Sequence, residues 1–317
     1  MKKIFVALAA VATMVACSKD EMVQQYQEAI GFGNAFVGNS TRVDEAADPS
    51  YSTTNALSAF QVWGAINDDE GFLPVFVNET VSGTVAAGST WNSTNPQYWV
   101  EDAKYNFAGL VNAGAVGLGK DQLPATVDFA VSTGKVDLLY ARSGEDIEGK
   151  ATGNDKVAMA FNHLLSKVMF TVNNSSIEAN AYSFLVKDIT INGVTAGTYT
   201  VSSGEWASTT IGDFKQFSTI SVAGGDAKEV CDSELLLIPG AVKVSFTVDI
   251  IYDDTTIATH TYSTADAAYT LVVGHAYNFV INVSVGERIQ FTVDSYPTWE
   301  NGNTAPAEGE KTYIPLN

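Results

Sequence analysis

Apolar and polar residues alternate with a period of two along most of this chain. From Val244 to Tyr252, apolar side chains at every second position alternate with Ser245, Thr247 and Asp249. The same alternation recurs in residues 168–172, 279–285 and 289–293. Successive side chains of a strand point to opposite faces of its sheet, so this pattern predicts strands with one face on a core and the other toward solvent.

Clusters of Gly, Asn, Asp and Ser separate the predicted strands. They occur at residues 67–71, 224–226 and 253–254. No long amphipathic helix is predicted, because the best helical stretch, His163 to Lys167, is too short to form a layer. Many short strands with frequent turn signals are typical of β-sandwiches. The sequence therefore predicts an all-β protein.

A polar, glycine-rich segment between Arg142 and Lys156 is a candidate boundary between two domains. Predicted strands at 136–141 and 157–161 flank it, and 317 residues are enough for two domains of ~150 residues each. This gives an N-terminal sandwich over residues 17–150 and a C-terminal sandwich over 151–317, with a mobile tail from about residue 301. The same segment also fits a long hairpin loop within one domain.

The first residues have the pattern of a secretory signal. Lys2 and Lys3 precede an apolar run from Ile4 to Ala16, and Cys17 follows. A charged start, a short apolar core and a small residue before a cleavage point are typical of such signals. The run is shorter than the ~20 residues that a spanning helix needs.

The cysteine at the cleavage point is similar to that of bacterial lipoprotein signals. There the peptide, here residues 1–16, is removed, and the cysteine, here Cys17, carries acyl chains that hold the protein on a membrane. The alternative is an ordinary signal peptide with an incidental cysteine, since Met14 stands where leucine is commoner.

Composition limits the classes of partner. The chain is 46% hydrophobic and 17% charged, with a formal net charge of −19. A strongly acidic surface repels phosphates, which argues against nucleic acid as a partner. If Cys17 carries lipid, Cys231 is the only other cysteine, and no intramolecular disulfide is expected.

No motif predicts catalysis. Gly114 to Lys120 has the glycines and lysine of a phosphate loop, but Asp121 stands where a Ser or Thr must hold magnesium, and Pro124 opposes the helix that should follow. The three histidines, His163, His260 and His275, lack the spacing of a metal site. We therefore expect no enzyme, no metal and no cofactor.

An aromatic cluster at Trp91, Tyr98 and Trp99 lies among Asn, Ser and Thr residues. Aromatic rings stack on sugars, so this cluster is a candidate glycan contact. The alternative is that these rings belong to the core, as aromatic residues in sandwiches usually do.

Segments spread in order along the chain resemble the fimbrillin family of the Bacteroidales, also called Mfa-like proteins, which are subunits of type V pili. After the lipoprotein signal, the matching segments are residues 30–32, 40–43, 60–64, 91–99, 136–141, 157–168, 235–239, 274–279 and 289–293, followed by Trp299. The ordered set is specific, although no single segment is. Lys19-Asp20-Glu21 is similar to the signal that sends lipoproteins of this group to the outer surface.

The resemblance implies two tandem transthyretin-like β-sandwiches and a surface-exposed protein that is lipid-anchored in the outer membrane and found in a fimbrium. The implied partners are other fimbrial subunits, the outer membrane through Cys17, and ligands on host or bacterial surfaces. The role left open is that of stalk, anchor or tip. The rival hypothesis is a surface glycan-binding lipoprotein for nutrient capture.

The resemblance also implies assembly by strand exchange. A first strand at about 29–37 would fill a groove of the N-terminal sandwich through Ile30, Phe32 and Phe36. A protease cutting after Arg42 would release that strand with the lipid, and a strand from the next subunit would replace it. The chain has three arginines, and Arg142 and Arg288 adjoin predicted strands, which favours Arg42; the alternative is that Arg42 is an ordinary loop residue.

Two further assignments depend on the same resemblance. The candidate donor strand is C-terminal, with Tyr313, Ile314 and Leu316 as its side chains. Asp254-Thr255-Thr256 is similar to the short O-glycosylation sites of these bacteria, which makes Thr255 a candidate acceptor.

Overall fold

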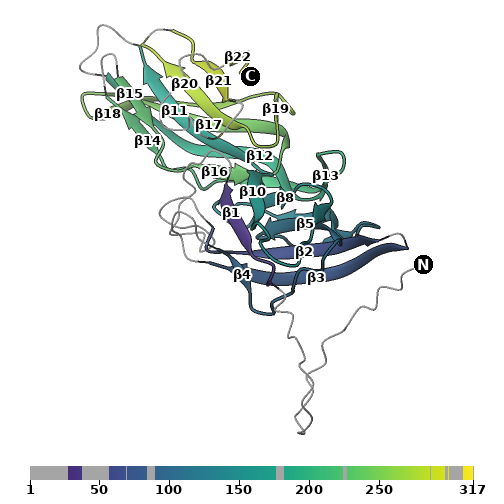
Figure 1. Ribbon diagram of the computed structural model, residues 1–317. Coiled ribbons are helices and arrows are strands. Elements are labelled where there is room, and N and C mark those ends of the chain that lie inside the picture. Colours follow the sequence, from purple (N-terminus) through teal and green to yellow (C-terminus); the bar gives the residue numbers. More distant parts are fainter. Residues whose placement is uncertain are drawn as a thin grey trace, which may run out of the picture.

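The computed structural model describes residues 28–37, 57–68, 70–83, 90–175, 182–223, 227–285, 287–296, 299 and 310–316. Within these ranges the protein is all-β, as predicted, and its strands form three sheets (Figure 1). The signal residues, Cys17 and Arg42 lie outside the described residues.

The first sheet forms the N-terminal sandwich, in the strand order β1-β10-β8-β5-β2-β3-β4, with β9 on β5. Its strands are β1 (Phe32–Val37), β2 (Ala59–Asp68), β3 (Gly71–Ser82), β4 (Asn92–Ser93), β5 (Lys104–Val111), β8 (Leu139–Arg142), β9 (Ile147–Glu148) and β10 (Val157–His163). Trp91, next to β4, forms a bridge to Phe32 of β1. The two ends of the sheet therefore meet, and β1 closes it.

Two further sheets pack face to face around a shared apolar core and form the C-terminal sandwich. The second sheet has the order β15-β11-β20-β21-β22, with β16 on β11. Its strands are β11 (Ser166–Asn174), β15 (Ala227–Val230), β16 (Leu235–Leu237), β20 (Ala276–Val283), β21 (Gln290–Tyr296) and β22 (Glu310–Ile314).

The third sheet has the order β18-β17-β12-β7-β6, with β13 and β14 on β12 and β19 on β17. Its strands are β6 (Val116–Leu118), β7 (Pro124–Ala130), β12 (Tyr182–Thr200), β13 (Glu205–Phe214), β14 (Ile220–Val222), β17 (Gly240–Tyr252), β18 (Thr255–Ser263) and β19 (Tyr269–Leu271). Val244, Phe246 and Val248 of β17 are buried in the shared core, so the alternation in this segment marks its inner face.

The strands do not separate at residue 150. β10, which follows the expected boundary, pairs with β1 and β8 of the first sheet, and β7, which precedes it, pairs with β12 of the third sheet. The polar segment between Arg142 and Lys156 contains β9 and connects two strands of the first sheet. Glycine and charge mark a long connection inside a sheet as well as a linker, so composition alone does not decide between the two interpretations of this segment.

A third apolar cluster, here called the junction cluster, joins the two sandwiches. It contains Trp63 and Leu110 of the first sheet, Val127 of the third, and Tyr296 and Trp299 from the end of the second. Together these side chains bury the contact between the sandwiches, which therefore pack as one unit.

Candidate functional site: the seat of the first strand

β1 is hydrogen-bonded along both of its edges. On one side it runs parallel to β10, with Phe32 opposite Val157 and Val37 opposite Phe161. On the other side, Phe32 and Trp91 each donate a backbone N–H to the other's carbonyl oxygen at 2.9 Å, and the Ile30 N–H donates to a carbonyl oxygen at 2.8 Å. β1 is therefore inserted between β10 and residues 91–99. We call β10 and residues 91–99, with the core beneath them, the first-strand seat.

Phe32 is the residue of β1 whose side chain lies at the centre of this seat. Its side chain is 0% exposed, and its ring meets the rings of three other strands edge to face. The centroid distances are 5.8 Å to Phe60, 5.8 Å to Phe76 and 5.6 Å to Phe107. Aromatic contacts of this geometry stabilise a core beyond the area that they bury. The first strand thus completes the aromatic core of the N-terminal sandwich.

The alternation along the first strand changes phase partway. Ile30 and Phe32 are buried as expected, but the next buried side chains are those of Ala35 and Val37. The pairing with β10 shifts register between Gly33 and Phe36. Such an irregularity adds a residue to one strand and reverses which side chains face inward after it. The simple alternation that places Phe36 in one row with Ile30 and Phe32 does not account for this; the Phe36 side chain is outside the described residues.

A polar contact fixes Glu28, which lies just before the first strand. The Glu28 carboxylate accepts hydrogen bonds from the backbone N–H of Asn154 at 2.9 Å and from its Nδ2 at 3.1 Å. The backbone bond from Asn154, followed by the side-chain bond, holds the pKa of Glu28 below its ordinary value. A lowered pKa means that this contact stabilises the folded state above the ordinary carboxyl range and weakens as the pH falls through it.

Trp91 and Trp99 line the seat. They are 1% and 3% exposed; the Trp91 Nε1 donates to the Leu57 carbonyl oxygen at 2.6 Å, and the Trp99 ring lies 4.8 Å from that of Tyr105. Buried rings offer no face to a sugar, so the expected glycan cluster reduces to Tyr98, which is 46% exposed. The alternative that these tryptophans belong to the core fits their burial.

The candidate donor strand lies in its own molecule. β22 pairs with β21 at the edge of the second sheet, with Ile314 opposite Phe291. Ile314 is 2% exposed, whereas Tyr313 is 61% exposed. Leu316 forms a bridge to Thr264, beside the third sheet. The segment thus contacts both sheets of the C-terminal sandwich, and of its three candidate donor residues only Ile314 is buried.

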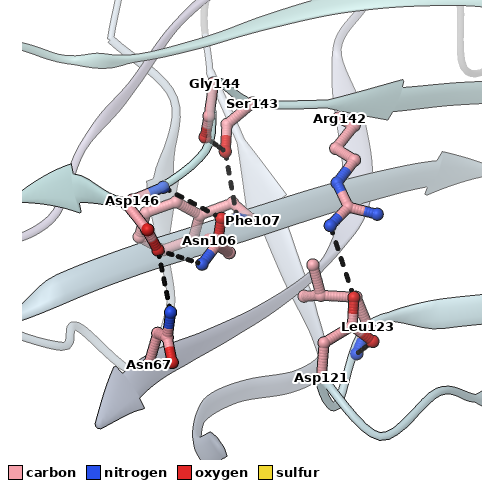
Figure 2. Close-up of polar contacts among 9 residues, drawn as sticks. All are labelled: Asn67, Asn106, Phe107, Asp121, Leu123, Arg142, Ser143, Gly144 and Asp146. Carbon is pink, nitrogen blue, oxygen red and sulfur yellow. Dashed lines mark hydrogen bonds and ion pairs between the residues drawn. The ribbon is translucent and has the colours of Figure 1, made fainter.

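Arg142 is held in a folded strand. It lies in β8 opposite Ala108 of β5, and its Nη2 is 3.3 Å from the Asp121 carboxylate (Figure 2). A protease binds its substrate as an extended segment, so cleavage here would require β8 to leave the sheet. Arg288 is exposed, in the connection that precedes β21.

The loop after β8 is also fixed (Figure 2). Asp146 accepts hydrogen bonds from Asn67 Nδ2 at 3.1 Å and Asn106 Nδ2 at 3.2 Å, and its N–H donates to Asn106 Oδ1 at 3.1 Å. The bond from Asn67, then that from Asn106, lowers the pKa of the Asp146 carboxyl. These bonds oppose the local opening that cleavage near Arg142 would need.

Other features singled out by the sequence are structural. Residues 116–118 of the segment similar to a phosphate loop form β6, and a turn follows in which the Gly119 N–H donates to the Leu123 carbonyl oxygen at 2.8 Å. Cys231 is buried and unpaired. Among the described residues, no three His, Cys, Asp or Glu side chains gather as a metal site. Nor does that part of the chain contain a helix suited to crossing a membrane.

Comparison with known proteins gives a family and a fold. The profile of the family described as fimbrillin-like matches residues 41–295. A search of curated proteins gives no significant match.

Solved structures with the same fold come from Bacteroides. A fimbrial protein from Bacteroides vulgatus ATCC 8482 superposes with a TM-score of 0.61 at 15% identity, over 85% of this chain and 99% of the other. A candidate cell adhesion protein from Bacteroides uniformis ATCC 8492 superposes with a TM-score of 0.53 at 17% identity, over 86% and 98% of the two chains. At these identities the likeness concerns the fold.

Proposed function

This chain belongs to the fimbrillin-like family, and on that premise we propose that it is a structural subunit of a cell-surface fimbria that assembles by strand exchange. The first strand leaves its seat after proteolysis, and a strand of another subunit takes its place. The role is structural rather than enzymatic, and the partners are other fimbrial subunits.

The observation that carries this proposal is the position of β1. It supplies Phe32 to the aromatic core and is paired on both edges, yet it is the first described strand of the chain. One cut between β1 and Leu57 therefore separates it covalently from the rest of the fold. Its departure would leave unpaired backbone on β10 and on residues 91–99, an arrangement that accepts an added strand.

We place the cut after Arg42, within that connection. The lipid on Cys17 precedes the cut, so cleavage also frees the subunit from the outer membrane. A cleaved subunit is suited to the stalk, whereas one that keeps its first strand and lipid is suited to the anchor. Electron microscopy of cells labelled with antibody against residues beyond 43 tests the proposal, since label along filaments indicates a stalk and label at the cell surface an anchor. The absence of labelled filaments from cells in which the protein is cleaved would contradict a fimbrial role.

The proposed donor is the C-terminal strand. β22 is an edge strand, and Pro315 has no backbone N–H, which an edge position tolerates. A chain lacking residues 310–317 should fold and be cleaved but form no polymers, because it has no strand to donate. Size-exclusion chromatography after digestion with an Arg-specific protease measures this, with a chain lacking Asn317 alone as the control. Polymers of the longer deletion would show that the donor lies elsewhere.

We also propose Thr255 as an O-glycan acceptor. It is exposed at the first position of β18, after a tight turn in which Asp253 and Asp254 have φ of 45° and 59°. Thr255→Ala should remove a glycan mass from protein isolated from the native cell, whereas Thr256→Ala should leave a glycan on Thr255. Mass spectrometry of the hairpin peptide decides this, and an unmodified wild-type peptide would contradict the assignment.

A further inference from the structure

The chain leaves the second sheet through a buried tryptophan. Trp299 follows the end of β21 closely, and the next described residue is Glu310, at the start of β22. The Trp299 side chain is 1% exposed and lies in the junction cluster. The root of the C-terminal tail is therefore buried between the two sandwiches, although the strand that it leads to lies at a sheet edge.

Trp299 stacks on His163. The two ring centroids are 3.6 Å apart, with 14° between the planes. His163 is itself fixed: its Nδ1 is 2.5 Å from Asp137 Oδ2, and it pairs with Leu139 in β8. Both His163 and Asp137 are buried. The tail root therefore rests on a side chain that β8 and the segment just before it hold in place.

His163 is also the last residue of β10, the strand that forms one edge of the first-strand seat. β10 runs parallel to β1 from Val157 to Phe161. In the described part of the chain, β1 is the only ladder partner of these β10 residues, because β8 pairs only with Asn162 and His163. A continuous set of contacts thus connects the strand in the seat, β10, His163 and Trp299.

We propose that the stack of Trp299 on His163 is a mechanical stop, which passes tension on the C-terminal tail into β10 and the strand in the first-strand seat. This inference rests on the proposed function, in which the C-terminal strand joins the next subunit and the tail then carries the load of the fimbria. With the stop in place, the load bypasses most of the C-terminal sandwich.

The direction of the strands explains why the stop would raise the force needed to separate them. β1 and β10 are parallel and are pulled from opposite ends, so the ladder bonds on both sides of the register shift share the load in shear. Without the stop, the pull acts on the end of β21 at Tyr296, which pairs with Ala276 of β20. Tension applied at that end loads the β20–β21 pairs one after another, and the strand unzips at a lower force.

Single-molecule force spectroscopy of the lipid-free, uncleaved chain tests the stop without requiring polymers. The chain is tethered by peptide tags at its two ends. In the wild type, β22 and the tail should come away first, over about 17 residues or roughly 60 Å, and extension should then halt. In Trp299→Ala, extension should continue into β21 by roughly 35 Å more, at less than half the wild-type force of the second step.

The matched control is Trp206→Ala. Trp206 also packs against the junction cluster, and its Nε1 donates to the Leu164 carbonyl oxygen at 3.0 Å, but it lies on β13, and its ring packs against that of Tyr199. This variant should lose stability and keep the halt. If Trp299→Ala does not fold, Trp299→Leu keeps an apolar side chain without a ring to stack and should show the same continued extension.

The two proposals fail separately. A halt that is unchanged in Trp299→Ala or Trp299→Leu overturns the stop and leaves strand exchange untouched. A halt that also disappears in Trp206→Ala overturns it too, because the effect would then reflect general loosening of the junction. Continued extension confined to the Trp299 variants supports the stop, even if the cleaved protein never polymerises and the proposed function falls.

Discussion

Replacing Phe32 by alanine should lower the free energy of unfolding of the uncleaved protein by about 3–5 kcal/mol. The ring is fully buried and contacts Phe60, Phe76 and Phe107, so alanine leaves a cavity that three surrounding strands must close or leave open. Urea denaturation followed by circular dichroism measures the change. Such a loss is large against the 5–15 kcal/mol that stabilises a typical domain.

The control for this variant is Val77→Ala on β3, whose side chain is 58% exposed. An exposed truncation of this kind should change stability by no more than about 0.5 kcal/mol. A Phe32→Ala loss as small as that of the control would mean that the first strand is not part of the folded core. Removal of the first strand would then leave no unfilled groove for a strand of another subunit.

Arg42→Ala should abolish cleavage by an Arg-specific protease at this position, and with it polymer formation, while leaving stability unchanged. The uncut connection keeps β1 at a high effective concentration beside its own seat, so a strand from another molecule cannot compete. Gel mobility and electron microscopy measure the two outcomes. Tryptophan emission gives a third readout, because loss of β1 exposes Trp91 and Trp99, which are 1% and 3% exposed with β1 in place.

Arg288→Ala is the matched control, since Arg288 is exposed in a connection between strands, whereas Arg142 lies within β8. This variant should still be cut after residue 42 and should still polymerise. Polymers of Arg42→Ala, or a wild-type cut within residues 137–142, would refute the assignment. The second outcome would require β8 to open despite its pairing with β5 and the ion pair of Arg142 with Asp121.

The fold class was predictable because the alternation of apolar and polar residues that identifies a strand is a local property of the sequence. In β17 the buried apolar residues, Val242, Val244, Phe246 and Val248, are spaced two apart, and this spacing can be read from neighbouring positions alone. Ile30 and Phe32 were predictable as inward-facing residues for the same reason. The register shift after Gly33 was not, because the partner strand imposes it and β10 lies more than a hundred residues away in sequence.

The walls of the seat were harder to predict. Trp91 and Trp99 were visible as an aromatic cluster, but a sequence does not tell whether an aromatic ring faces solvent or core when polar residues surround it. Their burial depends on β1 pairing with residues 91–99, a long-range contact with no local signal. The stack of Trp299 on His163 was hidden for the same reason, although both residues stood out individually.

The two sandwiches are interleaved along the chain, and this arrangement has a consequence for how such proteins diversify. β7 is made before the first sheet is complete and belongs to the third sheet, while β10 returns to the first. Neither sandwich is a contiguous stretch of chain. Recombination between relatives at mid-chain would therefore make strands from one relative pair within a sheet from the other. Exchange of genetic material is therefore expected to preserve this protein as a whole or not at all.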